Sequence, residues 1–172
     1  NLPRKGKFQP NENLLYDDYY RNSKNKQNNK LICQLGVFRK YLWSNAFDYE
    51  LQMLDLNKTG RYKILIVSSY DSNLELENLL LSWNPELEII TFSPNLLNAN
   101  LLQENKNKKK LSNLTIAYGL PEDIKGYFSE SNYKFDRILV SECLGNIANR
   151  LKFLADMKEL LSIEGFINIR TF

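Results

Sequence analysis

The chain of 172 residues contains no histidine. Histidine is the commonest general base in enzymes and the commonest nitrogen ligand of metal ions. Its absence excludes a catalytic triad built on histidine and argues against a zinc site. We therefore expect no metal site in this protein.

Cysteine is also scarce. The two residues, Cys33 and Cys143, lie far apart in the sequence and match no metal-ligand spacing. Both stand among apolar neighbours, so we expect two buried free thiols. Free thiols suit a reducing, intracellular compartment.

Long apolar runs are missing as well, and none approaches the roughly 20 residues that a membrane-spanning helix needs. The N-terminal region has no apolar segment of the kind that signal peptides carry. The first residue is Asn rather than Met, which indicates a processed or partial chain. A mature end left by removal of a mitochondrial presequence is one interpretation.

Glycine is absent from a place where it would be informative, between Ile64 and Ser72. An apolar run there leads into a turn and then into a helical pattern, Leu74–Trp83. A nucleotide-binding α/β fold places its glycine loop at this position, because glycine lets the backbone approach a cofactor closely. The chain thus has the strand, turn and helix pattern of a cofactor-binding fold, but it lacks the glycines of the cofactor loop.

What is present fits one globular domain with an N-terminal arm. Hydrophobic residues make up 43% and charged residues 25%, and the net charge of +3 is too small to imply nucleic acid by itself. Residues 1–30 are polar and rich in Asn and Lys, with one aromatic patch at Leu14–Tyr20, so we expect a flexible or partner-bound arm. Residues 31–172 form the predicted domain, which begins with helical patterns over Leu31–Leu56.

Five apolar runs after residue 60 are strand candidates, and they alternate with helical patterns. The predicted strands are Tyr62–Val67, Leu87–Phe92, Leu114–Tyr118, Phe135–Val140 and Phe166–Arg170, and the predicted helices are Leu74–Trp83, Pro94–Asn105 and Ala148–Leu161. This alternation predicts a parallel sheet covered on both faces, with right-handed crossovers. We expect the last helix to pack Leu151, Leu154, Leu160 and Leu161 against the sheet.

Ligands of doubly wound sheets bind beyond the carboxyl ends of the strands. Polar and small residues follow four of the predicted strands there: Ser68, Ser69, Tyr70, Ser93, Asn95, Tyr118, Gly119, Ser141 and Glu142. These are the candidate cofactor-binding residues, and Glu142 is the one candidate for a catalytic role. Each also has a structural interpretation, since serines form turns and cap helices, and a carboxylate at a strand end can cap a neighbouring helix.

Three segments resemble one family. FDRILVSECLGN, Phe135–Asn146, resembles the fourth-strand segment of class I S-adenosylmethionine-dependent methyltransferases, most of all the cyclopropane-fatty-acid-synthase and coclaurine N-methyltransferase group, whose usual wording is FDRIISVEMFEH. LLSIEGFINIRTF, Leu160–Phe172, resembles the fifth-strand segment of that group. TFSPN, Thr91–Asn95, resembles its TLSxxQ turn, which binds the adenosine ribose. The resemblance spans Tyr62–Phe172 and implies a Rossmann-like α/β sheet in parallel order 3-2-1-4-5, with S-adenosylmethionine as cofactor.

The cofactor loop departs from the family pattern, which is VLDxGxGxG. Ile66 stands in the place of the acid, and Ser68, Tyr70 and Ser72 stand in the places of the three glycines. The resemblance implies that a side chain at Tyr70 projects toward the methionine part of the cofactor. We therefore expect no bound cofactor at this place.

The end of the fourth strand departs in the same way, because the Glu-His pair of the family is replaced by Gly145 and Asn146. Gly145 offers neither a base nor a cation ligand. The family sheet normally has seven strands, and this sequence stops after the fifth, so the C-terminal strands are missing from it. If Phe172 is the true end of the chain, we expect the outer edge of the fifth strand to recruit a partner protein, whereas a further C-terminal segment would cover that edge.

Three functional hypotheses follow. The first is a methyltransferase-like protein that has lost catalysis and serves as a structural or accessory subunit of a larger assembly. The second is an active S-adenosylmethionine-dependent methyltransferase with a divergent cofactor loop, in which Glu142, Tyr118 and Tyr70 face the cofactor. The third is a nucleic-acid-binding protein on the same fold, which would use the lysines of 106–110 and the basic arm.

Overall fold

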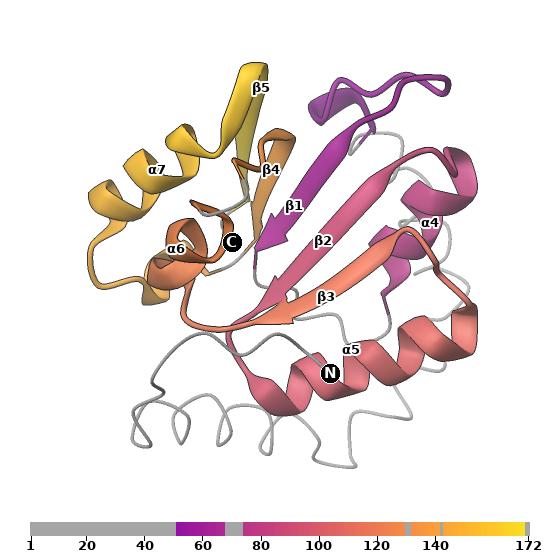
Figure 1. Ribbon diagram of the computed structural model, residues 1–172, viewed down its shortest axis with the longest axis horizontal. Coiled ribbons are helices and arrows are strands. Elements are labelled where there is room, and N and C mark those ends of the chain that lie inside the picture. The colour runs from indigo at the N-terminus through magenta and orange to yellow at the C-terminus, as the bar shows by residue number, and fades with distance from the viewer. Residues whose placement is uncertain (1–50, 68–73, 130–131, 142, 171–172) are drawn as a thin grey trace, which may run out of the picture. The chain divides into compact units, whose positions relative to one another are not determined.

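The computed structural model describes residues 51–67, 74–129, 132–141 and 143–170, and the structural statements below concern these residues. From residue 57 onward they belong to one compact unit (Figure 1). The predicted arm, most of the predicted helical segment Leu31–Leu56, and Cys33 lie outside the described residues. None of the described helices combines the length and the apolar character that a membrane span requires.

A parallel five-stranded sheet forms the centre of this unit. Its strands are β1 (Lys63–Val67), β2 (Glu88–Ser93), β3 (Leu114–Tyr118), β4 (Phe135–Ser141) and β5 (Leu161–Arg170). The strand order is β3-β2-β1-β4-β5 and every pairing is parallel, which confirms the predicted Rossmann-like sheet. The last four residues of β1 are buried, as expected for a central strand covered on both faces.

The fifth strand is longer than predicted, because it begins at Leu161 rather than at Phe166. Leu161 is paired with Phe135 and Phe166 with Arg137, so the residues between them form a bulge against β4. Gly165 fits this bulge because a Cβ atom there would lie 2.8 Å from the carbonyl oxygen of Phe135. The regular part of β5 therefore starts at Phe166, where the sequence places the whole strand.

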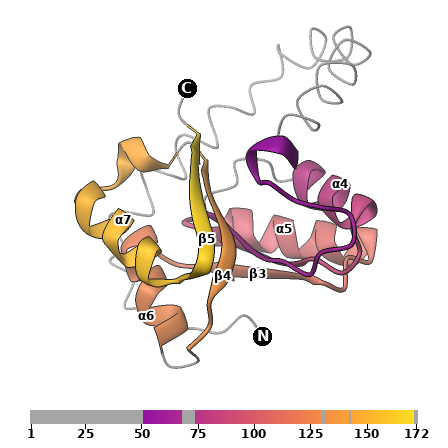
Figure 2. The same ribbon diagram turned by 90° about the horizontal axis from the view of Figure 1, so that it is seen from above.

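Helices cover both faces of the sheet. Figure 2 shows α4 (Glu75–Trp83) and α5 (Leu96–Lys109) on one side, and α6 (Ile124–Ser129) and α7 (Arg150–Glu159) on the other. Two short 3₁₀ turns complete the unit, η1 (Pro121–Asp123) before α6 and η2 (Leu144–Asn146) before α7. The sequence did not predict α6, since six residues with a central glycine give too short a pattern to recognise.

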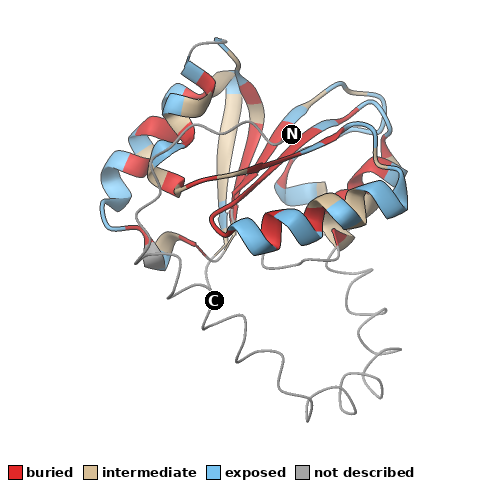
Figure 3. Ribbon diagram, turned by 60° about the horizontal axis from the view of Figure 1, so that its bottom comes forward, coloured by how far each residue is buried: buried red, intermediate tan, exposed pale blue. Residues whose placement is uncertain are grey.

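The core beneath α6 and α7 differs from the predicted set of leucines. Phe153 and Met157 are the buried apolar residues of α7, whereas Leu151 is 83% exposed, so the prediction that Leu151 packs on the sheet is wrong. Figure 3 shows buried and exposed segments alternating along the helices that flank the sheet. Leu154 is partly buried against this core and Leu160 is buried. The helix begins at Arg150 rather than at Ala148, and its inward face is set by Phe153 and Met157, four residues apart.

Candidate functional site

The carboxyl ends of parallel strands share one edge of the sheet, and in Figure 1 the arrowheads of β1, β2 and β3 point to that edge. The predicted residues Ser93, Tyr118 and Gly119 lie together there. Ser93 is paired with Tyr118 in the sheet register. The backbone N–H of Gly119 donates to the carbonyl oxygen of Ser93 at 3.1 Å. Ser68, Ser69, Tyr70 and Glu142 lie outside the described residues.

Three buried polar residues at the end of β2 and just beyond it bond to one another. The Ser93 hydroxyl donates to the carbonyl oxygen of Asn95 at 3.2 Å and accepts from the side-chain amide of Asn98 at 3.1 Å. It also accepts from the backbone N–H of Asn95 at 3.4 Å. The Asn95 side chain caps α5 by accepting from the backbone N–H of Asn98 at 3.1 Å.

This network limits what the turn after β2 can offer to a ligand. A hydroxyl group has one hydrogen and two lone pairs, and the bonds above occupy all three on Ser93. Ser93, Asn95 and Asn98 are all buried. Residues 93–95 also include no carboxylate. Sequence reasoning missed Asn98, because the predicted helix Pro94–Asn105 placed Asn95 inside the helix, whereas the structure makes Asn95 the N-cap of α5 and brings Asn98 three residues after it.

Two aromatic side chains, Phe92 and Tyr127, pack together near the end of β3. The ring of Tyr127, from α6, meets Phe92 edge-on with ring centroids 5.8 Å apart. Burial, and secondarily Tyr118, raise the pKa of the Tyr127 phenol above its usual value, so this phenol is neutral at physiological pH. A Cβ atom at Gly119 would lie 3.0 Å from the ring of Phe92, so this position has little room for a side chain.

The end of β4 presents few groups for catalysis among the described residues. Ser141 is partly buried and is paired with Arg170 of β5. Cys143 is buried, and burial raises the pKa of its thiol to about 12, so the thiol is protonated and unreactive. Gly145 is exposed, and the guanidinium of Arg150 donates to its carbonyl oxygen at 3.1 Å.

The prediction of a free buried thiol is confirmed for Cys143. No three histidine, cysteine or acidic residues gather into a metal-binding group in the part of the chain that the structure describes.

The lysine cluster lies away from this edge. Lys106, Lys108 and Lys109 occupy the last turn of α5, just before β3 begins, at the opposite edge of the sheet. Cations in the last turn of a helix stabilise its C-terminus. The cluster therefore has a structural role that needs no nucleic acid.

Comparison with protein-family profiles finds no match, and neither does comparison with curated protein sequences. Solved structures do match. Coclaurine N-methyltransferase bound to N-methylheliamine and SAH is 14% identical with a TM-score of 0.59, over 73% of this chain and 34% of that one. A putative sarcosine dimethylglycine methyltransferase from Galdieria sulphuraria is 18% identical with a TM-score of 0.57, over 77% of this chain and 46% of that one.

The same fold also occurs in a protein named for a different reaction. The [4+2]-cyclase SpnF is 11% identical with a TM-score of 0.61, over 73% of this chain and 43% of that one. The chain thus matches between about a third and a half of the length of these three proteins. At such low identity the likeness concerns the fold alone. The sheet order and these structures together show that the chain has the fold of class I S-adenosylmethionine-dependent methyltransferases.

Proposed function

We propose that this chain is a methyltransferase-like protein without methyltransferase activity, which acts as a structural or accessory subunit of a larger assembly. One observation carries the proposal: the hydrogen-bonding groups of Ser93 are occupied within the turn after β2. The resemblance assigns ribose binding to this turn. Ribose hydroxyls need acceptors, and Ser93 could accept from them only by giving up a bond inside the protein.

The strand before the cofactor loop supports the same conclusion. Ile66 stands where the family has an acid, and it is buried in β1. The loop that follows has Ser68, Tyr70 and Ser72 in place of three glycines. The cofactor loop thus lacks its glycines and the Ser93 hydroxyl is bonded within its own turn, while the buried residues that hold the sheet together are retained.

Titration of the purified chain with S-adenosylmethionine and with S-adenosylhomocysteine tests the proposal. We expect no heat of binding and no change in the melting temperature. A ligand present at 100 times its dissociation constant would stabilise the fold by about 2.7 kcal/mol, which such a measurement detects readily. Saturable binding of either compound by the unmodified chain would refute the proposed loss of cofactor binding.

A matched variant makes a negative result informative. The triple substitution Ser68→Gly, Tyr70→Gly and Ser72→Gly restores the glycines of the family pattern. Ser93 remains bonded within its turn in this variant, so we expect weak binding at most. Strong binding by the variant, with none by the parent chain, would place the defect in the loop alone.

An active methyltransferase with a divergent loop is the alternative. The observation in its favour is that the carboxyl edge of the sheet is retained, and that matching structures include a methyltransferase solved with S-adenosyl-L-homocysteine. In this alternative Glu142, Tyr118 and Tyr70 face the cofactor, and proximity supplies most of the catalysis. Transfer of a labelled methyl group to small-molecule, peptide or RNA acceptors would establish it.

The accessory half of the proposal concerns β5. Among the strands that the structure describes, β5 is the last in the sheet order, and Ile169 is 42% exposed on it. A long sheet edge with exposed apolar residues pairs readily with another chain. This supports the proposal that a protein partner contacts the chain at the β5 edge.

A further inference from the structure

The exposed side of α5 combines apolar and basic residues. Leu97 and Leu101 are 56% and 40% exposed, and Lys108 lies in the last turn of the same helix. Steps of four and seven residues return to the same side of an α-helix, so these three residues share one side. The opposite side packs inward through the buried residues Ala99 and Leu102. Two leucines are thus left exposed on a helix that already has a buried side.

The second half of this helix is strongly basic. Four lysines stand at its end, with the C-cap included: Lys106, Lys108, Lys109 and Lys110. Glu104 is the one acidic residue between the first leucine of the helix and its C-cap. The leucines therefore form one half of the exposed side, and the positive charge forms the other half.

The composition of the helix discriminates among classes of partner. The segment Leu96–Lys110 contains no arginine and no aromatic residue. Interfaces between proteins are enriched in those residue types and depleted of lysine. Proteins that bind single-stranded RNA stack bases on aromatic rings, and exposed leucines add nothing to such binding. A membrane surface with anionic lipids uses both halves, because apolar side chains enter the boundary between headgroups and acyl chains while lysines face the headgroups.

We propose that the exposed side of α5 binds the surface of membranes that contain anionic lipids. The helix lies along that surface, with Leu97 and Leu101 below the headgroups and Lys108 among them. Charge complementarity selects anionic lipids, and the leucines add the apolar area that such binding requires. Glu104 lies between the two halves and opposes the binding. The proposal goes beyond the proposed function and does not depend on it.

Sedimentation of the chain with lipid vesicles is the first test. We expect binding to vesicles of phosphatidylcholine and phosphatidylserine in equal parts, and little binding to phosphatidylcholine alone. Added salt should weaken the binding, because it screens the lysines. Failure to bind the mixed vesicles would overturn the proposal. Tighter binding to a single-stranded RNA than to these vesicles would overturn it as well.

Two matched lysine variants locate the charge. Lys108→Gln and the control Lys158→Gln each remove one positive charge from an exposed residue, and Lys158 lies on α7, which covers the other face of the sheet. A lysine at an anionic membrane surface contributes about five-fold to binding. We expect a loss of that size from Lys108→Gln, almost none from the control, and a gain from Glu104→Gln. Equal losses from the two lysine variants would refute the placement on α5.

Two tryptophan variants show which helix meets the lipid. Leu97→Trp on α5 and the control Leu151→Trp on α7 each replace a leucine that is more than half exposed. The two tryptophans of the chain itself contribute to both variants alike. With vesicles that contain brominated lipids, we expect the added fluorescence of Leu97→Trp to be quenched and that of Leu151→Trp to be retained. Equal quenching of both would contradict the proposal.

The double substitution Leu97→Ser and Leu101→Ser tests the apolar half. We expect vesicle binding to fall by about ten-fold or more, with the circular dichroism spectrum unchanged. Unchanged vesicle binding would refute the role of the leucines. Self-association without vesicles that this double substitution abolishes would show that a second copy covers α5 instead. None of these measurements involves the cofactor, so this proposal and the proposed function fail separately.

Discussion

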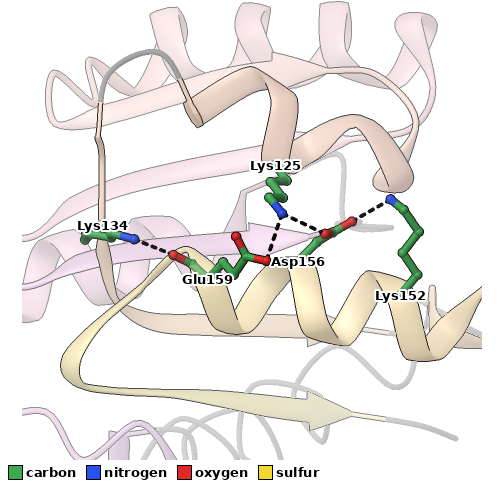
Figure 4. A network of polar contacts seen from close by, with 5 residues as sticks. All are labelled: Lys125, Lys134, Lys152, Asp156 and Glu159. Atoms are coloured by element: carbon green, nitrogen blue, oxygen red, sulfur yellow. Dashed lines mark hydrogen bonds and ion pairs between the residues drawn. The ribbon is translucent and has the colours of Figure 1, made fainter.

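Replacing Asp156 with asparagine tests whether ion pairs hold α6 against α7. The Asp156 side chain, on α7, is only 10% exposed, and its Oδ1 lies 3.3 Å from Nζ of Lys125 on α6. Its Oδ2 lies 2.8 Å from Nζ of Lys152, one turn earlier on α7. Lys125 also reaches Glu159 at 2.8 Å, and Figure 4 shows it between the two carboxylates.

The expected loss follows from the exposure of the lysines. The Lys125 and Lys152 side chains are 38% and 64% exposed, so water screens both pairs. Each such pair contributes roughly 0.3–1 kcal/mol. Asparagine keeps the shape of Asp156 and removes the charge. We expect Asp156→Asn to lower the free energy of unfolding by about 1 kcal/mol, and the melting temperature by about 2–4 °C.

The effect must depend on pH. The ammonium of Lys152, followed by that of Lys125, holds the pKa of the Asp156 carboxyl below its usual value, against the opposing effect of burial. A carboxyl whose pKa is lowered in the folded state stabilises the protein above its unfolded pKa. That stabilisation is lost as the pH falls through the folded pKa. The difference between parent and variant should therefore be full at neutral pH and shrink in acid.

Urea unfolding of the parent, Asp156→Asn, Lys125→Gln and the double variant measures both claims. At neutral pH the two substitutions should be less than additive, because they remove the same contact. A difference that stays constant as the pH is lowered would refute the reasoning, and so would full additivity at neutral pH.

Three further outcomes follow from the described contacts. Phe153→Ala should destabilise the fold by about 3–5 kcal/mol in urea unfolding, since it empties a buried site, whereas the exposed control Leu151→Ala should change stability by less than about 0.5 kcal/mol. Asn95→Ala removes the N-cap of α5 and should cost about 1 kcal/mol by thermal unfolding. In a Cys33→Ser chain, Cys143 should react with a thiol reagent only after denaturant is added, because its thiol is buried and its pKa is about 12; rapid reaction in native buffer would contradict this.

Local patterns in the sequence determined most of the fold. Within the described residues, the apolar runs predicted the strands β1–β5, since a strand buried on both faces needs continuous apolar residues, and the helical patterns predicted α4, α5 and α7 but not α6. The parallel order came from the resemblance carried by Phe135–Asn146, and the sheet confirms it. The absence of glycine between Ile64 and Ser72 is also a property of the sequence alone, and it supports the proposed loss of catalysis together with the bonding of Ser93.

Only the tertiary structure determined which side chains are engaged in hydrogen bonds within the protein and which are buried in the core. The sequence predicted Ser93 as a cofactor-binding residue. Whether its hydroxyl already has hydrogen-bond partners depends on Asn98, whose side-chain amide donates to it from the first turn of α5. The sequence also offered Leu151 as a core residue, but the start of α7 at Arg150 turns Phe153 and Met157 inward instead. The apolar residues of a helix determine that one of its faces is buried. Which residues form that face depends on where the helix starts and on what it packs against.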